Sequence, residues 1–399
     1  MNFIDALFEG AEGVWSGGAA HILIIISVVI ALGRLFGKIK IFGVSFGVTW
    51  VLFIGILFGH FGLTLDSNLL HFLKEFGLVI FVYSIGLQIG PGFFHSFKSG
   101  GLGFNLLAVI VVFIGVCITV LFYCLTDMPI TTVVGVMSGA VTNTPGLGAA
   151  QQAFFDISGK SAPDIALGYA VAYPLGVIGC IVTFVIIKKM FYHTSPSVKK
   201  KLPSAHKAEK KVRLSDHPNL IPIFFGIALG CLLGSIPFRF PGIPQPVKLG
   251  LAGGPLIASI LMSYLAPKLK FITYTTVSAN LMLREIGISI FLTCVGLEAG
   301  DHFIETLING GGIRWIAYGV VITVVPVLAG GFIGRYLFKM DYNTLIGILA
   351  GACTDPPALS YANELDDKNE DASLGYATVY PLTMFLRVLV AQLLILVFV

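Results

Sequence analysis

The sequence has few charged residues for its length. Asp, Glu, Lys and Arg make up 12% of its 399 residues, whereas a soluble domain carries about 25%. Apolar and aromatic residues (AVILMFWYC) make up 56%, and the mean hydropathy is +0.91. So little charge cannot cover a globule of this size, which argues against a soluble enzyme, a nucleic-acid-binding protein and a disordered chain. The composition predicts an all-α, polytopic membrane protein.

The sequence also lacks several short motifs of enzymes, pumps and channels. It has no GxxxxGK[ST] nucleotide-binding loop, no HExxH, no CxxC and no TVGYG filter. Its six cysteines stand singly in apolar stretches, without the spacing of a metal site or a disulfide framework. We therefore expect no catalytic residues, no enzyme activity, no metal centre, and no cofactor apart from a coupling H⁺ or Na⁺.

Long apolar segments are what the sequence does contain. A helix needs about 20 residues to cross the hydrocarbon layer, and ten uninterrupted segments approach or exceed this length: 20–36, 43–61, 72–90, 103–125, 165–187, 219–236, 248–266, 279–299, 313–338 and 373–398. Two further segments, 130–158 and 342–364, are apolar but interrupted by proline, glycine, threonine and asparagine or aspartate. We expect ten crossings and two broken segments.

A basic stretch separates the two sets of segments. Between Lys188 and Arg213 lie nine basic residues and one acidic residue, whereas the whole chain has a net charge of +4. Basic loops stay in the cytoplasm, so this stretch predicts a cytoplasmic linker. The expected organisation is an interfacial N-terminal segment, a first transmembrane repeat, the linker and a second repeat, over residues 1–18, 19–187, 188–217 and 218–399.

The same charge rule predicts the orientation. Counting back from the linker, the basic cluster from Arg34 to Lys40 lies inside, and both termini lie in the periplasm. This count requires that 130–158 enters and leaves on one side as a re-entrant hairpin. If 130–158 crosses fully, the Arg34 cluster lies outside, so the rule favours re-entry and leaves a full crossing as the alternative.

The two halves of the sequence repeat each other. Three pairs of blocks match in order, with eight of 18, seven of 16 and six of eight positions identical: 73–90 with 283–300, 132–147 with 344–359, and 167–174 with 374–381. Shared hydrophobicity would not place glycine, proline, tyrosine and glutamate in register, so the blocks indicate a duplication. Each half has five crossings, an odd number, which makes the repeats inverted. Inverted repeats are typical of secondary transporters with alternating access.

The broken segments carry the expected binding site, with the sequences Thr142-Asn143-Thr144-Pro145 and Thr354-Asp355-Pro356-Pro357. Proline lacks a backbone donor and clashes with the preceding turn, so we predict helix breaks near Thr142 and near Thr354. The freed carbonyls would suit a cation or ammonium group, and the N-terminus of the next half-helix would suit a carboxylate. We expect these eight residues to bind substrate. The alternative is a pair of ordinary proline kinks.

Two charged residues lie at membrane depth in the second half. Asp355 stands where the first half has Asn143, and an ionisable group at that depth is costly. We expect Asp355 to hold a substrate ammonium, to bind H⁺ or Na⁺, or to cap the following helix. Arg387 has Cys180 at its place in the first half. We expect it to bind substrate through a carboxylate, the alternatives being an ion pair with Asp355 or with Glu298.

With these features the sequence resembles the aspartate:alanine exchanger family of bacterial membrane proteins. The resemblance rests on the duplicated halves, the GxxxGxxTNTPxL and GxxxGxxTDPPAL blocks and the paired LGYAxxYP blocks, and it covers both membrane halves. It implies a carrier for small amino acids or dicarboxylates, such as aspartate and alanine, in the bacterial inner membrane. Many relatives have a pair of soluble regulatory domains between the halves, where this chain has only the linker.

The resulting expectation is a secondary active transporter. It would exchange small carboxylates or amino acids across the lipid bilayer by alternating access, with an elevator-like or rocking motion, and as a homodimer. The alternative is an ion or solute channel built on the same repeat. Counterflow separates the two, since a carrier accelerates uptake when substrate is present on the far side and a channel does not.

Overall fold

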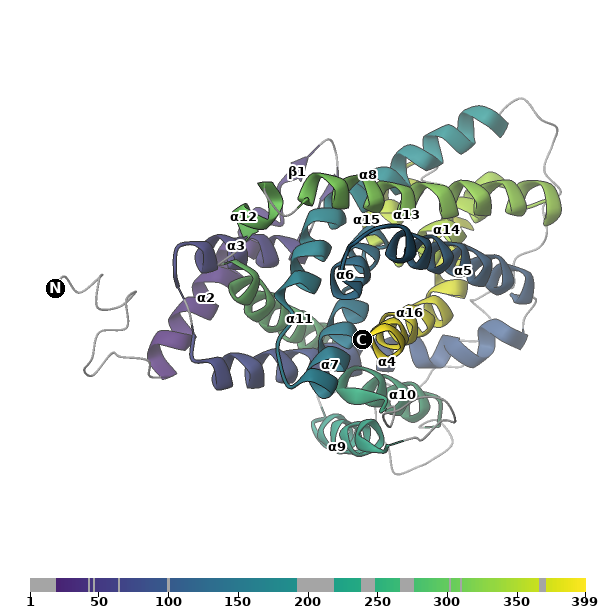
Figure 1. Cartoon of the computed structure of the whole chain (residues 1–399). Helices are drawn as coiled ribbons and strands as arrows, with labels where there is room; N and C mark the ends of the chain where they lie inside the picture. The colour runs from purple at the N-terminus through teal and green to yellow at the C-terminus, as the bar shows by residue number, and fades with distance from the viewer. Residues whose placement is uncertain are drawn as a thin grey trace. The chain divides into compact units, whose positions relative to one another are not determined.

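Figure 1 shows the chain in a computed structural model. The structure describes residues 19–41, 44–45, 47–63, 65–98, 101–191, 219–237, 248–265, 276–300, 303–308, 311–365 and 371–399. The interfacial segment expected at 1–18 and most of the linker expected at 188–217 therefore lie outside the described residues.

Nearly all of the described residues are helical. The first half contains α2 (Ala19–Phe36), η1 (Gly47–Thr49), α3 (Trp50–His60), α4 (Ser67–Lys98), α5 (Leu102–Leu125), α6 (Ile130–Ala140), α7 (Thr144–Ser158) and α8 (Pro163–Phe191). The second half contains α9 (Ile221–Ser235), α10 (Gly250–Leu265), α11 (Val277–Gly300), α12 (Phe303–Ile308), α13 (Gly312–Phe332), η3 (Ile333–Leu337), α14 (Tyr342–Ala352), α15 (Pro356–Glu364) and α16 (Asp371–Phe398). Two short strands, β1 (Lys40–Ile41) and β2 (Val44–Ser45), pair antiparallel, with Lys40 opposite Ser45.

Among the described residues, six helices are long and apolar enough to span a membrane. They are α4, α5, α8, α11, α16, and α13 continued by η3. The other four predicted crossings form the apolar helices α2, α3, α9 and α10, of 18, 11, 15 and 16 residues. At about 1.5 Å per residue these four extend less than the roughly 30 Å of the hydrocarbon core. All ten predicted segments are thus helical, six of them with spanning length, and the chain is a multi-pass membrane protein.

The chain forms two compact units. Unit 1 consists of Met1–Phe81 and Leu281–Gly312, and unit 2 of Val82–Asn280 and Ile313–Val399. Each unit takes segments from both halves of the sequence, so the units do not coincide with the two repeats expected in chain order.

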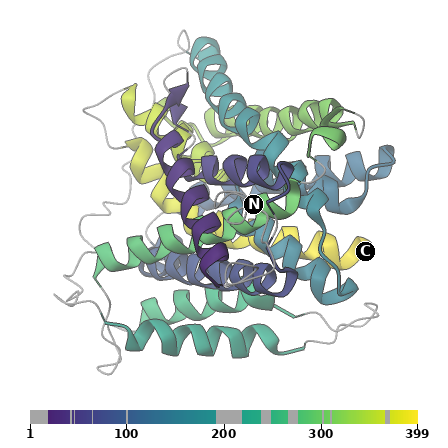
Figure 2. The same ribbon diagram turned by 90° about the vertical axis from the view of Figure 1, so that its left-hand side faces the viewer.

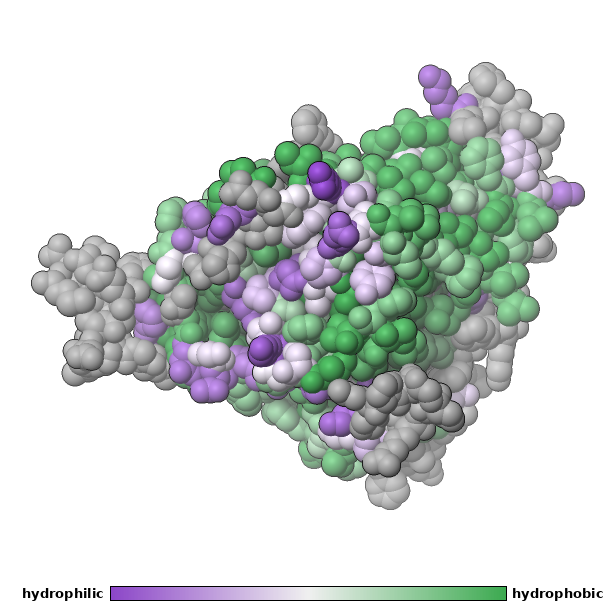
Figure 3. All heavy atoms as spheres, in the orientation of Figure 1, coloured by the Kyte–Doolittle hydropathy of each residue, from purple (hydrophilic) through white to green (hydrophobic). Residues whose placement is uncertain are grey.

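Apolar side chains also cover part of the surface of unit 2. On α5, Leu102, Phe113 and Leu121 are exposed, and on α13 so are Ile313 and Val325. Figure 3 shows green, hydrophobic residues gathered over the region where these two helices lie. Clustered exposed apolar side chains mark a surface that contacts lipid or another chain. Because both helices have spanning length, we infer that they face lipid.

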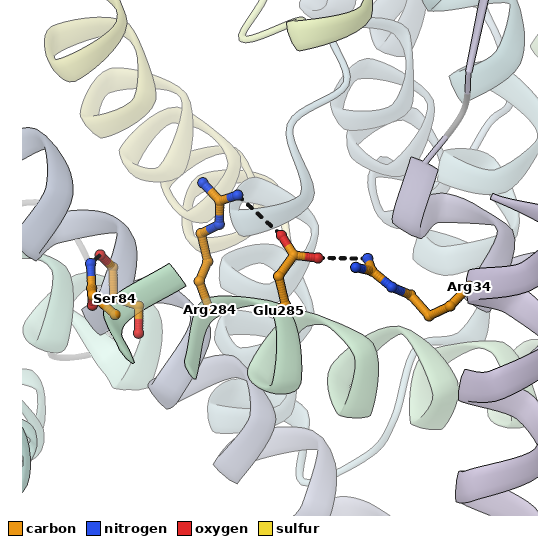
Figure 4. Close-up of polar contacts among 5 residues, drawn as sticks. Arg34, Ser84, Arg284 and Glu285 are labelled. Carbon is orange, nitrogen blue, oxygen red and sulfur yellow. Dashed lines mark hydrogen bonds and ion pairs between the residues drawn. The ribbon is translucent and has the colours of Figure 1, made fainter. Parts of the chain in front are cut away.

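Unit 1 contains two ion pairs between distant parts of the sequence. Lys74 Nζ of α4 lies 2.6 Å from Glu298 Oε2 of α11, and both side chains are largely buried. Arg34 of α2 binds Glu285 of α11 at 2.6 Å, and Arg284 lies 3.0 Å from the other oxygen of Glu285 (Figure 4). These contacts tie α2 and α4 to α11.

Unit 2 is built from helices whose backbones approach closely. A Cβ atom on Gly135 of α6 would overlap the carbonyl of Ile165 in α8, and one on Gly347 of α14 would overlap the carbonyl of Ala372 in α16. The two glycines occupy the same place in the two copies of the repeated block. Glycines at equivalent positions thus allow close helix packing in both copies. Elsewhere in unit 2, α9 and α10 lie side by side (Figures 1 and 2).

Candidate functional site: two broken helices

Unit 2 contains two interrupted helices, one from each half of the sequence. The first interruption separates α6 from α7, and the second separates α14 from α15. In each gap a threonine takes the left-handed backbone conformation, with φ of +52° at Thr142 and +54° at Thr354. This conformation costs a β-branched residue about 1–2 kcal/mol, so it persists only where the surroundings impose it. The predicted helix breaks near these two threonines are confirmed.

Each break is followed by a capped half-helix. Asn143 Oδ1 accepts a hydrogen bond from the main-chain N–H of Gly146 at 2.5 Å. Asp355 Oδ1 accepts the equivalent bond from Ala358 at 3.0 Å. Asp355 is thus a helix N-cap, one of the roles expected for it, and Asn143 is its counterpart at the start of α7.

The two breaks contact each other directly. Thr142 Oγ1 donates to the carbonyl of Thr354 at 3.1 Å, and Thr354 Oγ1 donates to the carbonyl of Val141 at 3.0 Å. Asn143 Nδ2 donates to Thr354 Oγ1 at 3.3 Å and contacts Met384 Sδ of α16 at 3.4 Å. Residues more than 200 positions apart in the sequence therefore form one buried polar cluster.

The carbonyls next to the breaks already have side-chain donors. The last carbonyl of α6 accepts from Thr323 Oγ1 at 2.6 Å. The last carbonyl of α14 accepts from Arg387 Nε at 2.7 Å, and the one before it from Thr383 Oγ1 at 2.8 Å. Together with the bonds of Thr142 and Thr354, these donors each give a hydrogen bond to a carbonyl beside one of the breaks. A carbonyl oxygen has two lone pairs, so the binding of a cation by these carbonyls stays a prediction.

The start of α15 offers fewer main-chain N–H donors to a carboxylate than an ordinary helix N-terminus does. Pro356 and Pro357 have no N–H, and the N–H of Ala358 is bound by Asp355. The first three residues of α15 thus offer no free donor to a carboxylate, and only the helix dipole remains to attract one. In α7, Pro145 lacks its donor in the same way.

The predicted residues of the first break are all buried: Thr142, Asn143, Thr144 and Pro145. In the second break Thr354 and Asp355 are buried, whereas Pro357 is partly exposed and Pro356 exposed. The hydroxyl of Thr144 lies 2.8 Å from the hydroxyl of Tyr169 in α8. The structure therefore gathers six of the eight residues in one buried region and leaves the two prolines of α15 at its edge.

Arg387 lies beside the second break. Its side chain is buried, and its Nε bond to the last residue of α14 fixes it there. Among the residues that the structure describes, no carboxylate forms an ion pair with Arg387. Of the protein partners expected for it, Asp355 makes no such pair, and Glu298 pairs with Lys74 inside unit 1.

Only one oxygen of the Asp355 carboxylate has a hydrogen-bond partner among the described residues. Its Oδ1 caps α15, but its Oδ2 is buried and has no hydrogen-bond partner in the described part of the chain. The residue itself is 0% exposed. A buried, unpaired carboxylate oxygen costs several kcal/mol, so this atom is a candidate position for binding a ligand or a proton.

Sequence reasoning missed other members of the cluster. Cys180 and Cys353, treated above as isolated cysteines, are buried and hydrogen-bonded to each other beside Arg387. The repeat was an available signal for Cys180, because Cys180 is the residue of the first half that is equivalent to Arg387. No local pattern pointed to Thr323 or Thr383, which bond across helices.

These observations define a class: a multi-pass helical membrane protein with a buried polar site built from two interrupted helices. The chain belongs to the family described as Predicted Permease Membrane Region (Asp-Al_Ex), whose sequence profile matches residues 25–189 and 222–396. The predicted resemblance to this family is confirmed, and the chain is a membrane transporter.

Relatives with transporter names match almost the whole chain. A protein of Bacteroides fragilis (strain YCH46) named as an uncharacterized transporter is 46% identical over 560 residues, covering 99% of this chain and 100% of that protein. Another of Bacteroides thetaiotaomicron is 36% identical over 558 residues, with 99% and 100% covered. Because 560 exceeds the 399 residues of this chain, the relatives contain residues that have no counterpart in it.

Proposed function

We propose that the chain is a secondary active exchanger of small amino acids or dicarboxylates, of the aspartate and alanine type, that works by alternating access. The observation that carries this proposal is the contact between the two breaks, with Asp355 in the second break and Arg387 beside it. A zwitterionic substrate offers an ammonium to the buried carboxylate of Asp355 and a carboxylate to the buried guanidinium of Arg387, and a dicarboxylate offers a carboxylate to the guanidinium. Neither side chain forms an ion pair with another described residue. Thr142–Pro145 and Thr354–Pro357 would surround it.

Arg387 is the group that we assign to a substrate carboxylate. Its guanidinium has a planar fork that matches a carboxylate with two parallel hydrogen bonds. Pro356 and Pro357 offer no N–H, so the guanidinium replaces the donors that an ordinary helix N-terminus would supply. Asp355 is the group that we assign to the substrate ammonium, through Oδ2.

The alternating-access part of the proposal rests on the repeated sequence. The equivalent positions Thr142 and Thr354 share a left-handed backbone, and the equivalent positions Asn143 and Asp355 share a capping role. Inverted repeats related by an axis in the membrane plane would bring equivalent breaks together near the midplane. The remaining parts of the proposal are an elevator-like or rocking motion, a homodimer, and an inner-membrane location with the linker in the cytoplasm and both termini in the periplasm.

Exchange by reconstituted vesicles tests the proposal. Vesicles containing the full chain are preloaded separately with aspartate, alanine, glutamate or succinate, and uptake of each labelled compound is followed. The proposal predicts that at least one preloaded compound accelerates uptake several-fold over empty vesicles. If no compound drives exchange, the assignment to amino acids and dicarboxylates is wrong.

The same assay addresses the channel alternative. Through a channel, a labelled compound equilibrates at a rate that does not depend on unlabelled compound inside the vesicle. Uptake that is rapid but insensitive to preloading would therefore favour a channel over an exchanger.

A further inference from the structure

The equivalent residues Asn143 and Asp355 differ in one side-chain heavy atom, Nδ2 in the first and Oδ2 in the second. Asn143 and Asp355 occupy equivalent positions, and each uses Oδ1 to cap a half-helix. Asn143 uses its second atom, Nδ2, to donate to Thr354 and to contact Met384. The second atom of Asp355, Oδ2, has no partner among the described residues. Both polar side-chain atoms of Asn143 thus contact protein groups, whereas only one oxygen of Asp355 does so among the described residues.

Main-chain carbonyls around both breaks already accept hydrogen bonds from side chains, which favours a proton over a metal cation at Asp355 Oδ2. A Na⁺ site in a broken helix is built largely from unwound main-chain carbonyls. In this site the carbonyls at and next to both breaks accept hydrogen bonds from Thr142, Thr323, Thr354, Thr383 and Arg387. In addition, the described residues contain no group of three or more His, Cys, Asp or Glu side chains that could hold a metal. A proton needs only the one oxygen.

We propose that Asp355 binds one H⁺ at Oδ2 when the site holds no cationic group, and that the ammonium group of an amino-acid substrate displaces this proton. The inference rests on the proposed function and names the coupling ion of the same site. In the exchange step the O–H bond of the carboxylic acid breaks, the proton passes to water, and the carboxylate that remains pairs with the ammonium. The charge of the substrate replaces the charge of the proton, so the buried carboxylate is neutralised in both states.

The other titratable groups near Asp355 are not carboxylic acids, which supports Asp355 as the group that binds the proton. Those that interact with it electrostatically are Tyr169 and Cys180 on α8 and Cys353 at the end of α14. Arg387 on α16 carries a permanent positive charge and interacts with both thiols. None of these four is a carboxylate.

The proposal distinguishes two classes of substrate. Aspartate and alanine carry an ammonium group and compete with H⁺ for Oδ2, so their binding releases a proton. Succinate carries no ammonium and must bind together with the proton. Linkage then requires the affinity for aspartate to rise with pH, by up to about tenfold per pH unit for one proton, and the affinity for succinate not to rise.

Calorimetry on the purified full chain measures this directly. Titrations with aspartate and with succinate, each in two buffers of different ionisation enthalpy, give the number of protons released per molecule bound. The inference predicts a release approaching one for aspartate and no release for succinate, and no change in affinity when K⁺ is replaced by Na⁺. Binding of aspartate without proton release, or affinity that depends on Na⁺, would overturn it while leaving the proposed function intact. No binding of aspartate, succinate, alanine or glutamate would overturn the proposed function itself.

Two variants complete the experiment. Asp355→Asn keeps an oxygen to cap α15, as Asn143 does for α7, and removes the titrating group; any aspartate binding that remains is predicted to release no proton. Asp341→Asn is the matched control, because Asp341 caps α14 with both oxygens bound by Thr344, at 2.9 and 2.6 Å. It is predicted to release protons as the wild type does. Proton release that survives Asp355→Asn contradicts the assignment.

Discussion

The hydroxyl of Thr142 donates to the main-chain carbonyl of Thr354 over 3.1 Å, and the hydroxyl of Thr354 donates back to the carbonyl of Val141 over 3.0 Å. Each threonine adopts a left-handed conformation that it would avoid in isolation. The reciprocal bonds supply part of the reason why it is kept: each break satisfies polar groups that the other one exposes. The site therefore depends on both halves of the sequence.

Removal of one hydroxyl from this pair is predicted to destabilise the protein. Thr142→Val keeps the shape and the β-branching but leaves a buried carbonyl without its donor, a cost of about 1–3 kcal/mol. Thr183→Val is the control, because Thr183 donates only to a carbonyl within its own helix, Gly179 O at 2.6 Å. Thermal unfolding of the purified protein is predicted to show a lower Tm for Thr142→Val than for Thr183→Val. Equal Tm values would show that the contact between the breaks contributes little.

The glycines that allow close helix packing are predicted to tolerate no side chain. Gly135→Ala and Gly347→Ala would each place a methyl group against a backbone carbonyl of the neighbouring helix, so α6 must separate from α8, or α14 from α16. Gly103→Ala is the control, since its nearest neighbour would lie 3.7 Å away on Phe338. The yield of folded protein after detergent extraction is expected to fall for the first two variants and to stay unchanged for the third. A normal yield of Gly347→Ala would contradict the packing.

Replacing only one residue of the Lys74–Glu298 ion pair is predicted to destabilise the protein, because the other charge stays buried without a partner. Lys74→Met leaves a buried carboxylate unpaired, at a cost of about 3–5 kcal/mol. The double variant Lys74→Met, Glu298→Met removes both charges and is expected to recover most of that loss. Unfolding transitions of the single and double variants give the comparison. A double variant as unstable as Lys74→Met would mean that the pair has another role.

Much of the fold could be predicted because hydrophobic length and the internal repeat are visible in the sequence. All ten uninterrupted apolar segments are helical, and Pro145 and Pro356 marked the places where helices restart. The four helices shorter than a membrane span were not predicted as such. Segment hydrophobicity also counts apolar residues outside the helix, such as those of β2 before η1, and so it overestimates helix length.

The site was predicted in its location and only partly in its detail. The pairing of Thr142 with Thr354 follows from the repeat, since equivalent breaks are expected to meet. The donors of Thr323, Thr383 and Arg387 to the main-chain carbonyls could not be predicted, because they depend on which helices pack around the breaks. For the same reason nothing in the sequence pairs Lys74 with Glu298, whose positions are 224 residues apart.

The central claim is that substrate binds where the two broken helices meet, with its carboxylate on Arg387. Counterflow in vesicles tests it most directly, with wild type, Arg387→Gln and the control Arg335→Gln, whose arginine at the end of the α13–η3 helix donates to Met340 O at 3.2 Å. The account predicts several-fold stimulation by internal substrate for wild type and Arg335→Gln, and a loss of at least about tenfold for Arg387→Gln, the effect of losing a bond worth 1.4 kcal/mol or more. Stimulation retained by Arg387→Gln would contradict the account.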